Sequence, residues 1–89
     1  MIMIAVHYAP TFVRMYKKLD PPLKEEVKEK IALFRDSNNH QALKVHKLSG
    51  ALNDRWSFSV NYKIRIVFRY GSSKNTANLL YVGSHDNVY

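Results

Sequence analysis

Four segments of this 89-residue chain carry the hydrophobic pattern of β-strands. Residues 2–8, 56–60 and 64–70 alternate in side-chain type, and residues 76–83 are apolar on both faces. Alternation with a period of two predicts strands, and a strand that is apolar on both faces is typical of the centre of a sheet. Asn61 and Tyr62 separate the second and third segments, which predicts a hairpin there.

Two segments between the first and second strands repeat hydrophobic residues every three or four positions, as amphipathic helices do. The repeated positions are Phe12, Met15, Tyr16 and Leu19 in the first segment, and Leu23, Val27, Ile31 and Phe34 in the second. Asp20 precedes two prolines, an arrangement that suits a helix cap and first turn. The pattern predicts helices over about 9–19 and 21–36.

This order of elements predicts a single α+β domain over residues 1–89, β-α-α-β-β-β in order, with two N-terminal helices packed on one face of a four-stranded, mainly antiparallel sheet. The connection over residues 40–54 is predicted to be mostly loop. Strand parity places four side chains on the second face of the sheet, and this face is predicted to be open, polar and basic. These side chains are Ser57, Ser59, Arg65 and Arg69.

The charge of the chain favours a polyanionic partner. Fourteen Lys and Arg stand against seven Asp and Glu, for a net charge of +7, and the excess is spread over both halves of the chain. A domain this basic is suited to nucleic acid first and to an acidic protein second, although a merely solvated basic surface is the alternative. The chain has no cysteine, and its apolar opening is too short for a signal peptide or a membrane span, so we expect a soluble cytoplasmic protein with no membrane partner.

Candidate chemistry lies on the third strand and after the last one. Arg65 and Arg69 are four residues apart on one strand and point to the same side, either into solvent or toward a phosphate that both could grip. His85 follows the last strand, where it is either a surface residue or a group that transfers protons near neutral pH.

A second histidine, His46, lies in the connection before the hairpin. Lys44 and Lys47 flank it, so this segment is either a solvated basic loop or a second imidazole with phosphate contacts beside it. Neither ligand spacing typical of a metal site nor a glycine-rich phosphate loop is found, and we expect no metal and no cofactor. Chemistry built on Arg, His and Tyr suits RNA cleavage in which the 2′-hydroxyl of the substrate attacks its own phosphate.

Nearly the whole chain resembles the RelE/ParE superfamily of bacterial type II toxin–antitoxin toxins. The resemblance is carried by "HKLSG" at 46–50, "WSFSVNYKIRIVFRY" at 56–70 and "LLYVGSHDNVY" at 79–89, in this order. For the RelE and YafQ branch it implies an endoribonuclease that cuts mRNA on the ribosome and so inhibits translation. It also implies an acidic antitoxin as partner, in a possible hetero-oligomer.

The resemblance assigns roles to four residues. Arg65 matches the arginine that acts on the scissile phosphate, and His85 falls where YafQ-type toxins have a catalytic histidine. Tyr89 matches the C-terminal aromatic residue that stacks on the substrate, and His46 matches the YafQ-type histidine ahead of "xLxG". The further residues expected to contact RNA are Lys44, Lys47, Arg69, Ser57 and Ser59.

The chain departs from both prototypes. Ser57 and Ser59 stand where RelE carries lysines, and Lys63-Ile64 stands where YafQ has Asp-Trp. Two alternatives therefore remain open, because they share the scaffold: a ParE-like inhibitor of DNA gyrase, and a catalytically weak binding relative.

Overall fold

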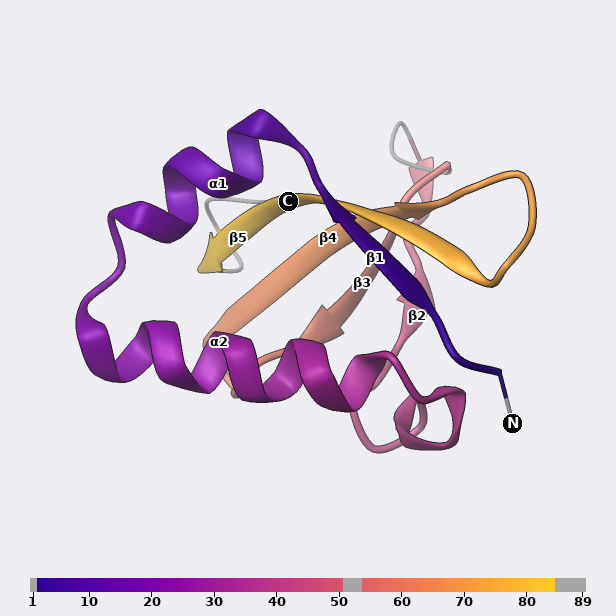
Figure 1. The fold of residues 1–89 in the computed structure, drawn as a ribbon, viewed down its shortest axis with the longest axis horizontal. Helices are drawn as coiled ribbons and strands as arrows, with labels where there is room; N and C mark the ends of the chain where they lie inside the picture. Colours follow the sequence, from indigo (N-terminus) through magenta and orange to yellow (C-terminus); the bar gives the residue numbers. More distant parts are fainter. Residues whose placement is uncertain (1, 51–53, 85–89) are drawn as a thin grey trace.

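The computed structural model describes residues 2–50 and 54–84, and Figure 1 shows their arrangement. Two helices and one short 3₁₀ helix precede most of the sheet. The elements in chain order are β1 (Ala5–Tyr8), α1 (Pro10–Lys17), α2 (Pro21–Phe34), η1 (Ser37–Asn39), β2 (His46–Lys47), β3 (Trp56–Ser59), β4 (Ile64–Tyr70) and β5 (Thr76–Ser84).

The described strands form one sheet in the order β1-β5-β4-β3-β2. β1 pairs with β5 in parallel, and the other three pairings are antiparallel. The predicted α+β class is confirmed, and β5 lies inside the sheet as its two apolar faces indicated. The predicted number of four strands is wrong, because the 40–54 connection contains β2. A strand of two residues is too short to produce an alternating pattern that a sequence would reveal.

The ends of the elements differ slightly from the predictions. The first strand begins at Ala5 rather than at residue 2, and Met3 makes one isolated bridge to Asp36. Both helices begin with proline in their first turn, where the missing N–H has no partner in the helix to lose. Asp20 occupies the N-cap position of α2, but its side chain makes no capping hydrogen bond. Within the described ranges, no helix has the length and apolar character needed to cross a membrane.

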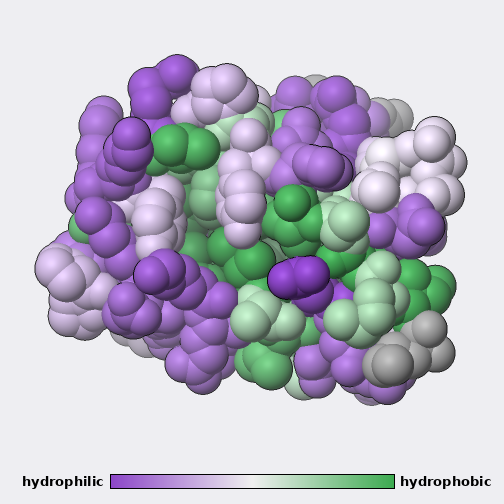
Figure 2. All heavy atoms as spheres, viewed as in Figure 1, coloured by the Kyte–Doolittle hydropathy of each residue, from purple (hydrophilic) through white to green (hydrophobic). Residues whose placement is uncertain are grey.

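Apolar surface remains visible between the two helices (Figure 2). A hollow of about 360 Å³ lies there, lined mainly by hydrophobic and aromatic side chains that include Phe12, Tyr16 and Ile31. The Phe12 ring also packs on Tyr8 and Tyr16, at centroid distances of 5.5 and 6.2 Å. This hollow offers packing surface but few groups for chemistry.

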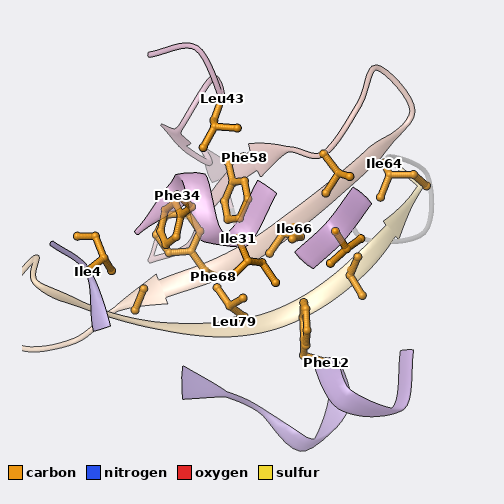
Figure 3. Close-up of a cluster of buried hydrophobic side chains, with 14 residues drawn as sticks. Ile4, Phe12, Ile31, Phe34, Leu43, Phe58, Ile64, Ile66, Phe68 and Leu79 are labelled. Carbon is orange, nitrogen blue, oxygen red and sulfur yellow. The ribbon is translucent and has the colours of Figure 1, made fainter. Parts of the chain in front are cut away.

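The core lies between the helices and one face of the sheet (Figure 3). Phe34 of α2 stacks on Phe58 with ring centroids 4.4 Å apart and meets the edge of Phe68 at 4.8 Å. Phe12 of α1 joins the same cluster, so both helices cover the same face of the sheet, as predicted. His40 is structural, because its ring stacks on Phe34 and its Nε2 lies 2.7 Å from the Phe34 carbonyl oxygen.

A β-bulge in β5 changes the direction of the side chains along this strand. Val67 pairs with Tyr81 and Phe68 pairs with Leu79, so Leu80 is the extra residue. As a result Leu79 and Val82, three positions apart, are both buried in the core. Tyr81 points to the other side of the sheet, where it joins the residues described below.

Candidate functional site

The far face of the sheet, the side opposite the helices, carries a row of four residues that pair across neighbouring strands. These are His46 on β2, Ser57 on β3, Val67 on β4 and Tyr81 on β5. Residues paired directly across strands share a face, so the row crosses the sheet. Two of the four, Ser57 and Val67, are 0% exposed.

The prediction that Ser57 projects from an open polar face is therefore wrong. Strand parity gave its direction correctly, but parity does not tell how deeply a side chain is covered. Serine is short and lies in the row between Val67 and His46. The guanidinium of Arg55, the residue before β3, lies 5.6 Å from the ring centroid of Tyr81 on β5. Sequence reasoning missed Arg55 and Tyr81, because only the bulge directs Tyr81 to this face.

Arg65 lies in the next row, between Ser59 and Gly83. It is half-buried, and its Nη1 donates hydrogen bonds to the carbonyl oxygens of Asn61 at 2.6 Å and Ile64 at 3.3 Å. These bonds hold the guanidinium beside the β3–β4 turn. Because a guanidinium carries five N–H donors, it can be fixed in this way and still bind a phosphate oxygen.

Arg69, the other arginine of β4, is held differently. Its Nη2 lies 3.0 Å from Oδ2 of Asp54, in an ion pair whose side chains are half exposed. Arg65 and Arg69 therefore share the far face, but the structure does not present them as two free cations.

His46 is exposed, and one of its nitrogens is already engaged. Its Nδ1 lies 2.8 Å from the carbonyl oxygen of Lys44. A carbonyl oxygen only accepts hydrogen bonds, so Nδ1 is the protonated nitrogen, and in the neutral ring Nε2 is left as an acceptor. This arrangement suits a general base.

Lys47 does not accompany His46. It pairs with Trp56, so it lies on the helix side of the sheet, whereas His46 pairs with Ser57 on the far face. Neighbouring residues of a strand point to opposite faces. The predicted trio around His46 is therefore divided by the sheet, and Lys44 remains as its basic neighbour.

Lys44 also lines a separate surface feature, which we call the basic hollow. This is a cavity of about 290 Å³ whose polar lining consists of Lys30, Lys44, Ser59, Asn61, Tyr62 and Arg65. Lys30 comes from α2, and no sequence pattern singles it out, because lysines are common in the last turns of helices. The structure brings it to the hollow together with Arg65.

A separate aromatic cluster lies at the other end of β4. The Nζ of Lys74 is 4.7 Å from the centroid of Trp56 and 5.5 Å from that of Tyr70. Burial raises the pKa of the Tyr70 phenol above its ordinary value of 10.0. Lys74, on the β4–β5 turn, therefore makes cation–π contacts with both rings.

His85 and Tyr89 lie outside the described residues, so their predicted roles remain predictions. The last described residue of β5, Ser84, pairs with Ile64 next to Arg65. No group of three or more His, Cys, Asp or Glu able to hold a metal ion is found in ranges 2–50 and 54–84.

Comparison with solved structures places this fold among bacterial and archaeal toxins. A chain of the toxin–antitoxin complex RelBE2 from Mycobacterium tuberculosis matches with a TM-score of 0.72 and 21% identity, over 94% of this chain and 100% of that one. YafQ from E. coli matches with a TM-score of 0.74 and 14% identity, over 97% of this chain and 98% of that one.

The archaeal RelE–RelB complex from Pyrococcus horikoshii contains a third similar chain, with a TM-score of 0.71 and 13% identity over 93% of this chain and 96% of that one. No protein-family model matches the sequence, and no curated protein matches it. The resemblance seen in the sequence is thus confirmed in three dimensions: this chain has the fold of the RelE and YafQ toxins.

Proposed function

We propose that this chain is the toxin of a type II toxin–antitoxin pair and that it cleaves mRNA on the ribosome. The observation that carries the proposal is that a RelE-type sheet presents His46, with an accepting Nε2, and the anchored guanidinium of Arg65 on the same face. A base and a fixed cation are what phosphodiester cleavage by an internal nucleophile requires.

The chemistry needs no resident metal. A base removes the proton of the 2′-hydroxyl, and the 2′-oxygen forms a bond to the adjacent phosphorus. The bond from phosphorus to the 5′-oxygen breaks, and an acid protonates this leaving oxygen, which produces a 2′,3′-cyclic phosphate and a 5′-hydroxyl end. Arg65 stabilises the negative charge that develops on the phosphoryl oxygens.

In this proposal His85 is the general acid or base, and His46 is the auxiliary proton carrier. Tyr89 stacks on or orients the substrate nucleotide. Arg69 and Lys44 contribute positive charge for contacts with the phosphate backbone, and Ser59 lies beside Arg65 and borders the same hollow as Lys44. Ser57 is not included, because it is buried.

The proposed partner in the cytoplasm is an acidic antitoxin segment that covers the Arg65 side of the molecule. A net charge of +7 favours such a partner. Association driven by charge is fast at low salt and slows steeply as salt is raised. A gene for a small acidic protein next to the gene for this chain is the expected finding.

The decisive experiment measures cleavage of mRNA bound to ribosomes. The purified variants are the parent, His85→Ala, Arg65→Ala and a chain ending at Val88, each checked for folding by circular dichroism. We expect each change to lower the rate about 10²-fold or more. A 2′-deoxy substitution at the cleaved nucleotide should abolish cleavage. The assignment is wrong if all three variants cut as fast as the parent, or if the deoxy substrate is cut.

Expression in a sensitive host separates the alternatives. Rapid loss of protein synthesis supports the nuclease. Filamentation with a DNA-damage response supports a gyrase inhibitor, and no growth defect supports a catalytically weak relative.

A further inference from the structure

The basic hollow brings together cations from three separate parts of the chain. Lys30 comes from α2, Lys44 from the turn that precedes β2, and Arg65 from β4. Lys44 adopts a left-handed backbone conformation with φ of 59°, which non-glycine residues seldom adopt. The cations are therefore gathered by the tertiary fold and do not form a run in the sequence.

No carboxylate lines the hollow in the described part of the chain. The carboxylate of Glu26, one turn before Lys30 on α2, contacts Asn61 of the lining: its Oε1 accepts a hydrogen bond of 2.8 Å from Asn61 Nδ2. Within ranges 2–50 and 54–84, neither Lys30 nor Lys44 makes an ion pair. Like charges held close together repel each other, and an anion bound between them removes this repulsion.

An exposed aromatic ring completes the surface. Tyr62 at the tip of the β3–β4 turn borders the hollow and is 91% exposed. The turn beneath it is ordered, because Oδ1 of Asn61 accepts hydrogen bonds from the backbone N–H groups of Lys63 and Ile64. An aromatic face on a rigid turn beside a cationic hollow is the arrangement that proteins use to stack bases and hold the phosphate backbone of single strands.

We propose that the basic hollow binds a backbone phosphate of single-stranded RNA, and that the base of the adjoining nucleotide stacks on Tyr62. The inference rests on the proposed function for the identity of the substrate. Arg65 lies at the boundary between the cleavage position on the far face and this hollow, so the RNA strand runs from the far face past Arg65 toward α2. Lys30 and Tyr62 are then residues that hold the substrate and take no part in the proton transfers.

The test measures binding of a fluorescent single-stranded RNA, protected from cleavage by 2′-O-methyl groups, as a function of salt. The variants are Lys30→Gln, Tyr62→Ala and Tyr62→Phe, and Lys63→Gln is the matched control on the same turn, outside the hollow lining. Lys30→Gln should reduce the slope of log K against log salt by about 0.7. Tyr62→Ala should weaken binding about tenfold, whereas Tyr62→Phe and Lys63→Gln should stay within about twofold.

Cleavage on ribosomes supplies a second measurement. We expect Lys30→Gln and Tyr62→Ala to raise KM with little change in kcat, because they remove contacts that substrate and transition state share. If both variants bind RNA and cleave like the parent, the hollow is not an RNA site, although the proposed nuclease stands. If the parent neither binds RNA nor cleaves mRNA, the proposed function fails and this inference fails with it. If Lys30→Gln and Tyr62→Ala weaken the binding of an acidic peptide but leave RNA binding intact, the hollow binds a protein partner and the inference is overturned.

Discussion

The Nη1 of Arg65 donates a hydrogen bond of 2.6 Å to the carbonyl oxygen of Asn61, at the beginning of the β3–β4 turn. This bond joins the proposed catalytic cation to the turn that carries Tyr62 and borders the basic hollow. The guanidinium is thereby positioned before any substrate arrives, and positioning of this kind lowers the cost of stabilising charge in the transition state.

Arg65→Lys should lose most of the activity although the charge is kept. A lysine has one ammonium group, which cannot hold the Asn61 carbonyl and grip two phosphate oxygens in the planar geometry of a guanidinium. We expect cleavage on ribosomes to slow about 10²-fold. Arg14→Ala on α1 is the control, because Arg14 is exposed and contacts Thr11 of its own helix. Equal activity of Arg65→Lys and the parent would contradict the proposed role of the planar guanidinium.

His46→Ala should slow cleavage about 10- to 100-fold, at or below the lower end of the range for a proton-transfer group, since His46 is proposed as the auxiliary carrier. Its exposed position on β2 makes a folding defect unexpected. His7→Ala is the matched control, because His7 is exposed on β1 at the opposite edge of the sheet. His40 does not serve as a control, since it stacks on Phe34 in the core. A His46→Ala variant with the rate of the parent would remove His46 from the mechanism.

Asp54→Asn should strengthen RNA binding. The change releases Arg69 from its ion pair and adds one unit of positive charge. We expect the slope of log K against log salt to steepen by about 0.7. The pair is half exposed, so the free energy of unfolding should fall by less than about 1 kcal/mol. Glu25→Gln on α2 makes the same charge change, and its effect on RNA binding should be smaller. If the two variants behave alike, the gain comes from net charge and not from Arg69.

Tyr70 should make the stability of the fold sensitive to alkaline pH. Burial raises the pKa of its phenol in the folded chain above the ordinary value of 10.0, so the folded state retains the proton where the unfolded state loses it. This contribution to stability is fully present below pH 10 and is lost as the pH rises through the folded pKa. Urea unfolding at pH 8 and pH 11 should show a smaller decrease for Tyr70→Phe than for the parent. Tyr62→Phe, at a 91% exposed position, should decrease like the parent.

Phe34→Ala should remove a large part of the folding free energy of the protein. Phe34 is fully buried and contacts Phe58, Phe68 and His40, so its removal leaves a cavity at the centre of the core. Such a change costs about 3–5 kcal/mol, out of about 5–10 kcal/mol for a domain of this size. Leu33→Ala, the adjacent and exposed position on α2, should cost far less. Denaturant unfolding followed by circular dichroism measures both, and equal losses would contradict this account of the core.

Much of the scaffold follows from the amino-acid sequence. The hydrophobic periods of about 3.6 and 2 residues predicted the helices, the long strands and their order, because burial of one face favours a regular pattern along the chain. The same periods identified Val27, Ile31 and Phe34 as core residues, and all three are buried. The pattern also placed Arg65 on the face away from the helices.

Only the tertiary structure decided how the site is assembled. The bulge at Leu80, the division of His46 from Lys47 and the burial of Ser57 all depend on pairing with strands distant in the sequence. The meeting of Lys30 with Lys44 and Arg65 depends on how α2 crosses the sheet. Local sequence determines the direction of a side chain within its own element. The burial of that side chain and the residues that it contacts are set by packing between elements, so no local pattern predicts them.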